Sequence, residues 1–178
     1  VVLRHYLRGG WAAKVSRQAY FFTGVSRSRP FREYHLLEAL YAVGLPVPRP
    51  VAALCQHHGV VSTGAIMTAR IETAKTLADL LISDDVADAV WVSVGKCIRR
   101  FHDAGVWHAD LNARNILLGA DFQVYLIDFD QARFRPEKPV NGEGNLNRLK
   151  RSLVKLCPAG KMPALQSAWI GLRVAYDE

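Results

Sequence analysis

The segment "WHADLNARNILL", residues 107–118, combines polar side chains that could do chemistry with an apolar run. Asp110 precedes Asn115 by five positions, and Asp128 follows Asp110 by eighteen. A carboxylate can accept the proton of a hydroxyl nucleophile, and a second carboxylate with an amide oxygen can hold Mg²⁺. Phosphoryl transfer needs such a set, together with a cation for the nucleotide phosphates. The alternative is that these side chains only cap a hairpin.

The elements around this segment would bring its polar residues together. Residues 116–118 and 124–127 are apolar and flank a turn, which predicts a β-hairpin with polar residues at both ends. A helix is expected over residues 84–103, because its apolar residues recur at helical spacing before Gly105. Asp110, Asn115 and Asp128 would then meet at one mouth of the hairpin.

The first seventy residues predict strands and one helix. Residues 1–6 are typical of a strand, and residues 11–16 could form its hairpin partner. Pro30 suits the start of a helix over residues 30–43, which carries Glu33 and Glu38. Two short strands are expected within residues 50–72, around a turn at His57 and His58 that we interpret as structural rather than as a zinc site.

The end of the chain predicts one more helix. Residues 141–145 are interpreted as a loop, and residues 146–156 as a basic amphipathic helix with its leucines facing inward. Basic residues of this helix could lie on an anionic membrane or could simply be solvated. They are Arg148, Lys150, Arg151 and Lys155.

Composition indicates a folded protein with an anionic partner. Of 178 residues, 50% are hydrophobic and 22% charged, and the net charge is +7. The first fifty residues contain eight Lys or Arg and two Glu, a net charge of +6. Such an excess of positive charge favours a partner that is nucleic acid, a phosphate group or an acidic membrane. The alternative is that these basic side chains are simply solvated. No secretory signal is apparent, residues 50–69 are too polar to span a bilayer, and three scattered cysteines predict reduced thiols.

The motif at residues 108–115, "HADLNARN", followed by "IDFD" at 127–130, resembles the H-R-D-x-x-x-x-N loop and the D-F-G of protein-kinase-like enzymes. The resemblance implies that Asp110 is the catalytic base, that His108 braces the loop, and that Asn115 and Asp128 hold Mg²⁺ beside the nucleotide. Asn112 stands where protein kinases usually have a lysine, and no A-P-E segment follows. A small-molecule or glycan hydroxyl is therefore expected as the acceptor, rather than a peptide.

Across nearly the whole chain the sequence is similar to the Kdo (3-deoxy-D-manno-octulosonic acid) kinases of lipopolysaccharide assembly. The segments that carry this resemblance include "VLRHYLRGG", "REYHLLEALYAVGLPVPRPVAA", "HADLNARNILL", "LIDFDQAR" and "NLNRLKRSLVKL". It implies an α+β, protein-kinase-like bilobal fold, with a partial N-lobe over residues 1–70 and a minimal C-lobe over residues 71–178. It also implies transfer of a phosphoryl group from ATP, with Mg²⁺, to a Kdo hydroxyl on a lipid A precursor. The enzyme would act as a peripheral protein at the cytoplasmic face of the inner membrane, with no nucleic acid and no obligate protein partner.

Two features of this expected site remain open in the sequence. By resemblance Arg4 falls where kinases have their phosphate-binding lysine, and Lys14 is its rival; we favour Arg4, with Glu33 as its partner. A kinase also covers its phosphates with a Gly-rich hairpin before this strand, and no such hairpin precedes Arg4. We therefore expect truncation at the N-terminus and weak ATP binding by this stretch alone.

Two other functions are compatible with parts of the pattern. An aminoglycoside-type phosphotransferase shares the H-x-D and I-D-x-D motifs, although such enzymes usually offer an acidic surface to their cationic substrates. A non-catalytic, kinase-shaped module could bind glycolipid or RNA, although it would have no reason to keep Asp110, Asn115 and Asp128 together.

Overall fold

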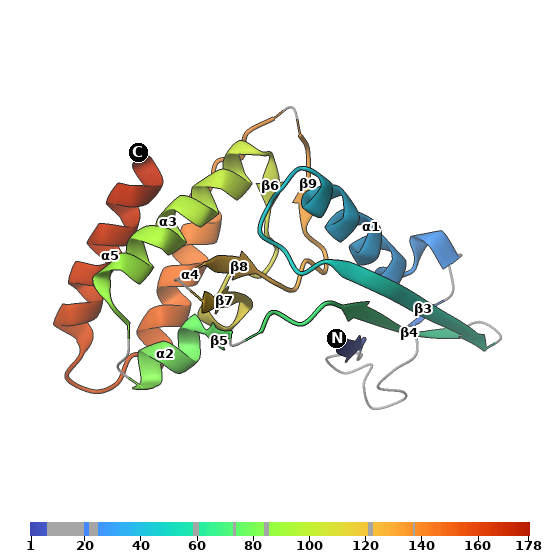
Figure 1. The fold of residues 1–178 in the computed structure, drawn as a ribbon, viewed down its shortest axis with the longest axis horizontal. Coiled ribbons are helices and arrows are strands. Elements are labelled where there is room, and N and C mark those ends of the chain that lie inside the picture. The colour runs from blue at the N-terminus through green and yellow to red at the C-terminus, as the bar shows by residue number, and fades with distance from the viewer. Residues whose placement is uncertain are drawn as a thin grey trace. The chain divides into compact units, whose positions relative to one another are not determined.

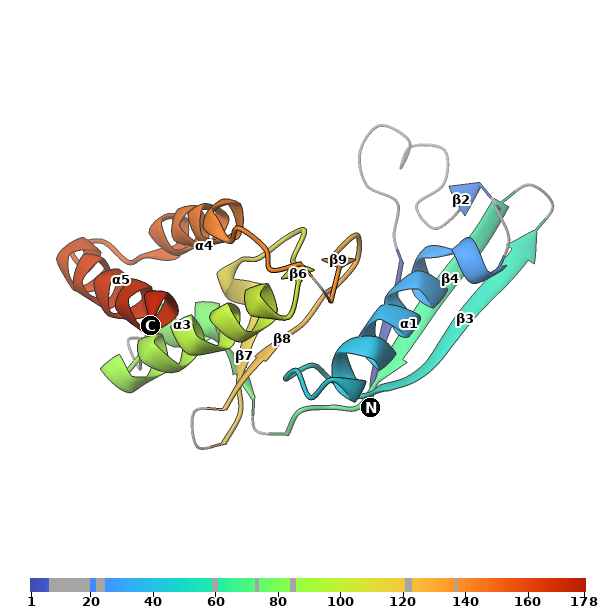
Figure 2. The same ribbon diagram turned by 90° about the horizontal axis from the view of Figure 1, so that it is seen from above.

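A computed structural model of the chain describes residues 1–6, 20–21, 25–58, 61–72, 74–83, 86–120, 123–136 and 138–178. The fold mixes small antiparallel sheets with helices, and Figures 1 and 2 show it from two directions. The chain divides into two compact units, one of residues 1–44 and 48–70 and the other of residues 45–47 and 71–178.

The first unit is an antiparallel sheet with one helix beside it. Strand β4 (Val61–Thr68) pairs with β1 (Val2–His5), β2 (Tyr20–Phe21) and β3 (Pro50–His58). A short 3₁₀ turn, η2 (Val25–Arg27), leads into helix α1 (Arg29–Ala42), which lies along β3 and β4 in both views (Figures 1 and 2). Pro30 stands in the first turn of α1, where its missing N–H leaves no helical bond unmade. Gly44 ends the helix at a φ of 76°.

The second unit contains two small sheets and four helices among the residues described. Strands β5 (Lys75–Thr76), β7 (Ile116–Leu118) and β8 (Val124–Leu126) form one antiparallel sheet, and β6 (Val106–Trp107) pairs with β9 (Arg133–Phe134). The helices are α2 (Leu77–Ser83), α3 (Asp88–Asp103), α4 (Glu143–Leu156) and α5 (Met162–Asp177), and η3 (Ala113–Asn115) is a 3₁₀ turn.

Helices α3, α4 and α5 enclose the core of this second unit. Apolar side chains at helical spacing on α3 are buried, and so are three of the four leucines predicted to face inward on α4. Helices α3 and α5 run side by side in both views (Figures 1 and 2). Gly95 permits this close approach, because a Cβ there would lie 2.3 Å from the Leu172 carbonyl oxygen.

The sequence predicted most of these elements, with four corrections. Strand β1, helix α1, the β3–β4 pair, the β7–β8 hairpin and the basic helix are confirmed. The turn predicted at His57 and His58 is wrong, because both residues belong to β3 and pair with Ser62 and Val61 of β4. Helix α3 begins at Asp88 rather than at residue 84. Ala87 is extended, with a ψ of 152°, so Val86 lies before the helix instead of on its apolar face. Helix α4 begins inside the predicted loop 141–145, and helices α2 and α5 were missed. The proposed strand over residues 11–16 lies outside the described residues.

No helix in the described part of the chain is both long and apolar enough to cross a bilayer.

Candidate active site

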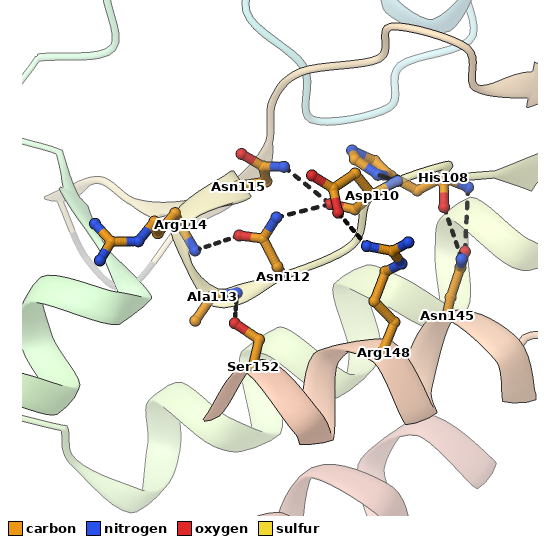
Figure 3. Close-up of polar contacts among 9 residues, drawn as sticks. All are labelled: His108, Asp110, Asn112, Ala113, Arg114, Asn115, Asn145, Arg148 and Ser152. Carbon is orange, nitrogen blue, oxygen red and sulfur yellow. Dashed lines mark hydrogen bonds and ion pairs between the residues drawn. The ribbon is translucent and has the colours of Figure 1, made fainter. Parts of the chain in front are cut away.

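The backbone of Asp110 is fixed on both sides while its carboxylate remains accessible (Figure 3). Its N–H donates to Nδ1 of His108 at 3.1 Å. Its carbonyl oxygen accepts two amide donors, Nδ2 of Asn112 at 3.1 Å and Nδ2 of Asn115 at 2.9 Å. The side chain is 53% exposed. The loop therefore holds the carboxylate in a set place where a substrate can reach it.

His108 joins the loop to the hairpin. Because Nδ1 accepts the Asp110 N–H, the ring proton is on Nε2, which donates to the carbonyl oxygen of Ile127 at 3.0 Å. Burial lowers the pKa of His108, so the ring is neutral at pH 7 and keeps this pair of roles. Phe129 packs against the imidazole, with ring centroids 4.9 Å apart. His108 thus ties the backbone of the loop to that of the hairpin, and its part in catalysis stays a prediction.

The hairpin brings the two proposed metal ligands to the same end. The N–H of Ile127 donates to the carbonyl oxygen of Asn115 at 3.0 Å, just beyond the pairing of β7 with β8. Asp128 is the next residue, and its φ of 64° lies in the left-handed region, which residues other than glycine seldom adopt. Such strain is often kept at functional positions, because it sets the direction of the side chain.

Asn115 and Asp128 suit Mg²⁺ by their chemistry. The amide of Asn115 uses its nitrogen to hold Asp110, so its oxygen is the atom that can bind a cation. Together with the Asp128 carboxylate this gives two hard oxygen donors, the kind Mg²⁺ prefers while phosphates and water complete its octahedron. Within the described residues no three His, Cys, Asp or Glu side chains form a metal-binding group, so the expected site depends on an amide and a carboxylate.

Asn145, on α4, holds the start of the proposed catalytic loop (residues 108–115) through two bonds to its backbone. Its Oδ1 accepts the N–H of His108 at 3.1 Å, and its Nδ2 donates to the His108 carbonyl oxygen at 2.7 Å. The same Oδ1 accepts from Nε2 of His102 at 3.1 Å, and Nδ1 of His102 accepts the Tyr176 hydroxyl at 2.8 Å. Burial lowers the pKa of His102, which keeps the ring neutral in this chain of bonds.

Two further side chains of α4 contact the same loop (Figure 3). Nη1 of Arg148 lies 2.5 Å from Oδ1 of Asp110. The hydroxyl of Ser152 accepts the N–H of Ala113 at 3.2 Å. Since Asn145, Arg148 and Ser152 are spaced by three and four residues, they form one face of the helix. That face supports the loop along its length.

In the first unit, Arg4 and Glu33 form an ion pair, with the Glu33 side chain only 4% exposed. The hydroxyl of Tyr6 also donates to the Glu33 carboxylate. Burial raises the pKa of Tyr6, and the Glu33 charge raises it further, so the phenol stays a donor. Glu33 shares its buried face with Leu37 and Leu40, whereas Glu38 is exposed. Phosphate binding by Arg4 remains a prediction, and its rival Lys14 lies outside the described residues.

Kinase-like phosphotransferases typically have a His-x-Asp loop, an Asn five residues after this Asp, and a second Asp just beyond the hairpin that follows. The chain belongs to the lipopolysaccharide kinase (Kdo/WaaP) family, whose sequence model matches residues 1–176. It is therefore a kinase by family.

Proteins from several bacteria are similar to this chain over almost its full length. A protein named 3-deoxy-D-manno-octulosonic acid kinase from Stenotrophomonas maltophilia (strain R551-3) is 45% identical over 176 residues, which cover 99% of this chain and 70% of the relative. Proteins of the same name from Xanthomonas euvesicatoria pv. vesicatoria and Haemophilus influenzae (strain Rd) are 47% and 39% identical over 99% of the chain, covering 70% and 75% of their own lengths.

Proposed function

We propose that this protein transfers the γ-phosphoryl group of ATP to a hydroxyl of Kdo on a lipid A precursor, in assembly of the lipopolysaccharide core. The observation that carries the proposal is the fixed Asp110 loop within a chain that resembles Kdo kinases over almost its full length. The two compact units would correspond to the N-lobe and C-lobe of the kinase-like fold.

In this reaction Asp110 accepts the proton of the acceptor hydroxyl and orients its oxygen toward the γ-phosphorus. The new oxygen–phosphorus bond forms as the bond from the γ-phosphorus to the bridging oxygen breaks, and ADP leaves with that electron pair. His108 keeps the loop in register with the hairpin. Asn115 and Asp128 would hold Mg²⁺, which neutralises charge on the phosphates when it is bound.

Arg4 would bind the nucleotide phosphates, with its guanidinium oriented by Glu33. A buried carboxylate that accepts bonds from both Arg4 and Tyr6 limits the rotamers open to the arginine. An arginine also suits phosphate, because its planar guanidinium can donate hydrogen bonds to two phosphate oxygens at once.

We further propose that the protein binds the anionic cytoplasmic face of the inner membrane as a peripheral protein. A groove of about 360 Å³ between α4 and α5 is mainly apolar, and Trp169 and the exposed Ile170 contribute to it. Lys150 lies over the Trp169 ring, 5.7 Å from its centroid, and Arg151 and Lys155 are exposed on the same helix. Each basic residue near such a surface adds about 1 kcal/mol of binding. The net +6 of the first fifty residues suits the same partner.

A transfer assay tests the proposed reaction. Full-length protein is incubated with labelled ATP, Mg²⁺ and a Kdo-lipid A precursor, beside the Asp110→Asn and Asp103→Asn variants. Asp103 is the matched control, because it is also an exposed carboxylate paired with an arginine. We expect label on the sugar, lost in Asp110→Asn and kept in Asp103→Asn. Transfer only to a cationic sugar, or none to any acceptor, would instead support one of the rival functions.

A vesicle assay tests the membrane proposal separately. Co-sedimentation with anionic vesicles should weaken in Ile170→Glu but not in Val92→Glu, which changes an exposed valine of another helix. Equal binding by both variants would contradict the assignment of this groove.

A further inference from the structure

The ion pair between Arg148 and Asp110 lies at the centre of the proposed chemistry. The two side chains approach to 2.5 Å, and they are 48% and 53% exposed. Exposed ion pairs contribute little stability, so folding alone gives weak reason to place an arginine on this carboxylate. An arginine beside the group that receives the acceptor proton needs another explanation.

The position of Arg148 is set by its helix. Asn145, one turn earlier, and Ser152, one turn later, both bind the backbone of the loop. These contacts fix α4 against the loop on either side of Arg148. The helix backbone that carries Arg148 is therefore held at a fixed position relative to Asp110.

The loop itself supplies no cation at the position where protein kinases usually have a lysine. Asn112 stands there, and its amide is used within the loop: Nδ2 donates to the carbonyl oxygen of Asp110, and Oδ1 accepts the N–H of Arg114. A phosphoryl group in transfer brings negative charge toward the Asp110 carboxylate. A fixed cation at this point would offset the repulsion in the transition state.

The chemistry of arginine allows it to hold Asp110 and a second anion together. A guanidinium carries five N–H donors in one plane, and the bond to Asp110 is made through Nη1. The same fork can bind another oxyanion in a bidentate manner.

We propose that Arg148 binds an oxyanion beside Asp110 during catalysis, and that it supplies from helix α4 the cation that is missing at position 112 of the loop. The inference rests on the proposed phosphotransferase activity. The oxyanion is either the phosphoryl group in transfer or the carboxylate of the acceptor sugar. Both are negatively charged oxygens adjacent to the reacting hydroxyl.

The test compares Arg148→Gln, Arg148→Lys and the control Arg173→Gln in the full-length protein. Arg173 of α5 forms an ion pair of 2.8 Å with Glu143 of α4, so its variant also removes a contact between an arginine and a carboxylate. Initial rates are measured with Mg-ATP and two acceptors, the Kdo-lipid A precursor and the same lipid with its Kdo carboxylate reduced to an alcohol. Unfolding midpoints are recorded for every variant.

We expect Arg148→Gln to lower kcat/KM about 100-fold. The kcat/KM of Arg148→Lys should lie between that of Arg148→Gln and that of wild type, and the kcat/KM of Arg173→Gln should stay near the wild-type value. If the phosphoryl group is the anion, kcat falls equally with both acceptors. If the carboxylate is the anion, KM for the natural acceptor rises, and wild type prefers it to the reduced acceptor whereas Arg148→Gln does not. Added guanidinium ion should restore part of the activity of Arg148→Gln in either case.

Activity of Arg148→Gln within threefold of wild type would overturn the inference. So would equal losses in Arg148→Gln and Arg173→Gln, because these would indicate only a structural pair. The wild-type rate judges the proposed function independently. If wild type transfers nothing to the lipid, the carboxylate of the acceptor sugar is ruled out as the oxyanion, and the same variants are compared in Mg-ATP hydrolysis. An unchanged hydrolysis rate in Arg148→Gln then refutes binding of the phosphoryl group by Arg148 as well.

Discussion

Replacing Asn145 by alanine should destabilise the protein and disturb the proposed catalytic loop. Asn145 is 1% exposed and satisfies three groups: the N–H and the carbonyl of His108, and Nε2 of His102. Each buried polar group left without a partner costs roughly 1–3 kcal/mol. Water entering the space left by the amide would recover part of this. We therefore expect a loss of about 3–5 kcal/mol, or roughly 10 °C in the unfolding midpoint for a chain of this size.

Asn147→Ala is the matched control, because Asn147 lies on the same helix with its side chain exposed. Urea unfolding of both variants gives the free energies, and phosphoryl transfer well below the unfolding midpoint gives the effect on the site. Asn145→Ala should lose both stability and kcat, and Asn147→Ala neither. A free energy of unfolding for Asn145→Ala within about 1 kcal/mol of that for Asn147→Ala would refute the role assigned to these bonds.

Three further changes test other parts of the structure. Gly142→Ala should strongly destabilise the protein, because its Cβ would lie 2.1 Å from Nδ1 of the buried His102. In Gly144→Ala the new Cβ meets no atom within 4 Å, so the free energy of unfolding should rise by up to about 1 kcal/mol. Thermal unfolding compares the two variants. Glu33→Gln should raise KM for ATP about tenfold, with exposed Glu38→Gln as control; equal values would remove Glu33 from the phosphate site. Because the pKa of His108 is lowered in the folded protein, the unfolded chain binds a proton at a higher pH than the folded one. The free energy of unfolding should therefore be unaffected by this group above about pH 6.5 and should fall as the pH drops below that value. A thermal unfolding midpoint that does not change from pH 7.5 to 5.5 would contradict this.

Local patterns were enough to predict the elements that carry the proposed catalytic residues. The β7–β8 hairpin follows from two apolar runs around a turn, and α1 from Pro30 and its leucine spacing. Glu33 was preferred to Glu38 as the partner of Arg4 because it shares a helix face with Leu37, and in the structure Glu33 is the buried one of the two. Each of these signals lies within a few residues of the feature it predicts.

The supports of the loop could not be predicted in the same way, because they join residues far apart in sequence. Asn145 falls beside Gly144 in a stretch that is typical of a loop, so nothing local marks it as the first turn of a helix. Arg148 was interpreted as a solvated or membrane-facing cation, since the sequence shows its charge but not its partner. Polar spacing along α4 (Asn145, Arg148 and Ser152) was the one available signal.

Helix α5 was missed because its sequence does not follow the simple pattern. Pro163 and Gly171 act as breakers in most sequence interpretations, yet Pro163 lies in the first turn, where it is tolerated.

Cys97, predicted to be a reduced thiol, is buried on α3, and burial raises the pKa of its thiol to about 12.

The chain of bonds from His108 to Tyr176 has a consequence for the order of events during synthesis. The catalytic loop leaves the ribosome well before α4 and α5, yet its partners Asn145 and, through His102, Tyr176 belong to those later helices. At roughly 5–20 residues per second, several seconds separate the two. Until the later helices emerge, the His108 backbone has only water to bind. The nascent chain therefore completes the bonds of this loop only after α4 and α5 have emerged, when the β7–β8 hairpin can already have formed.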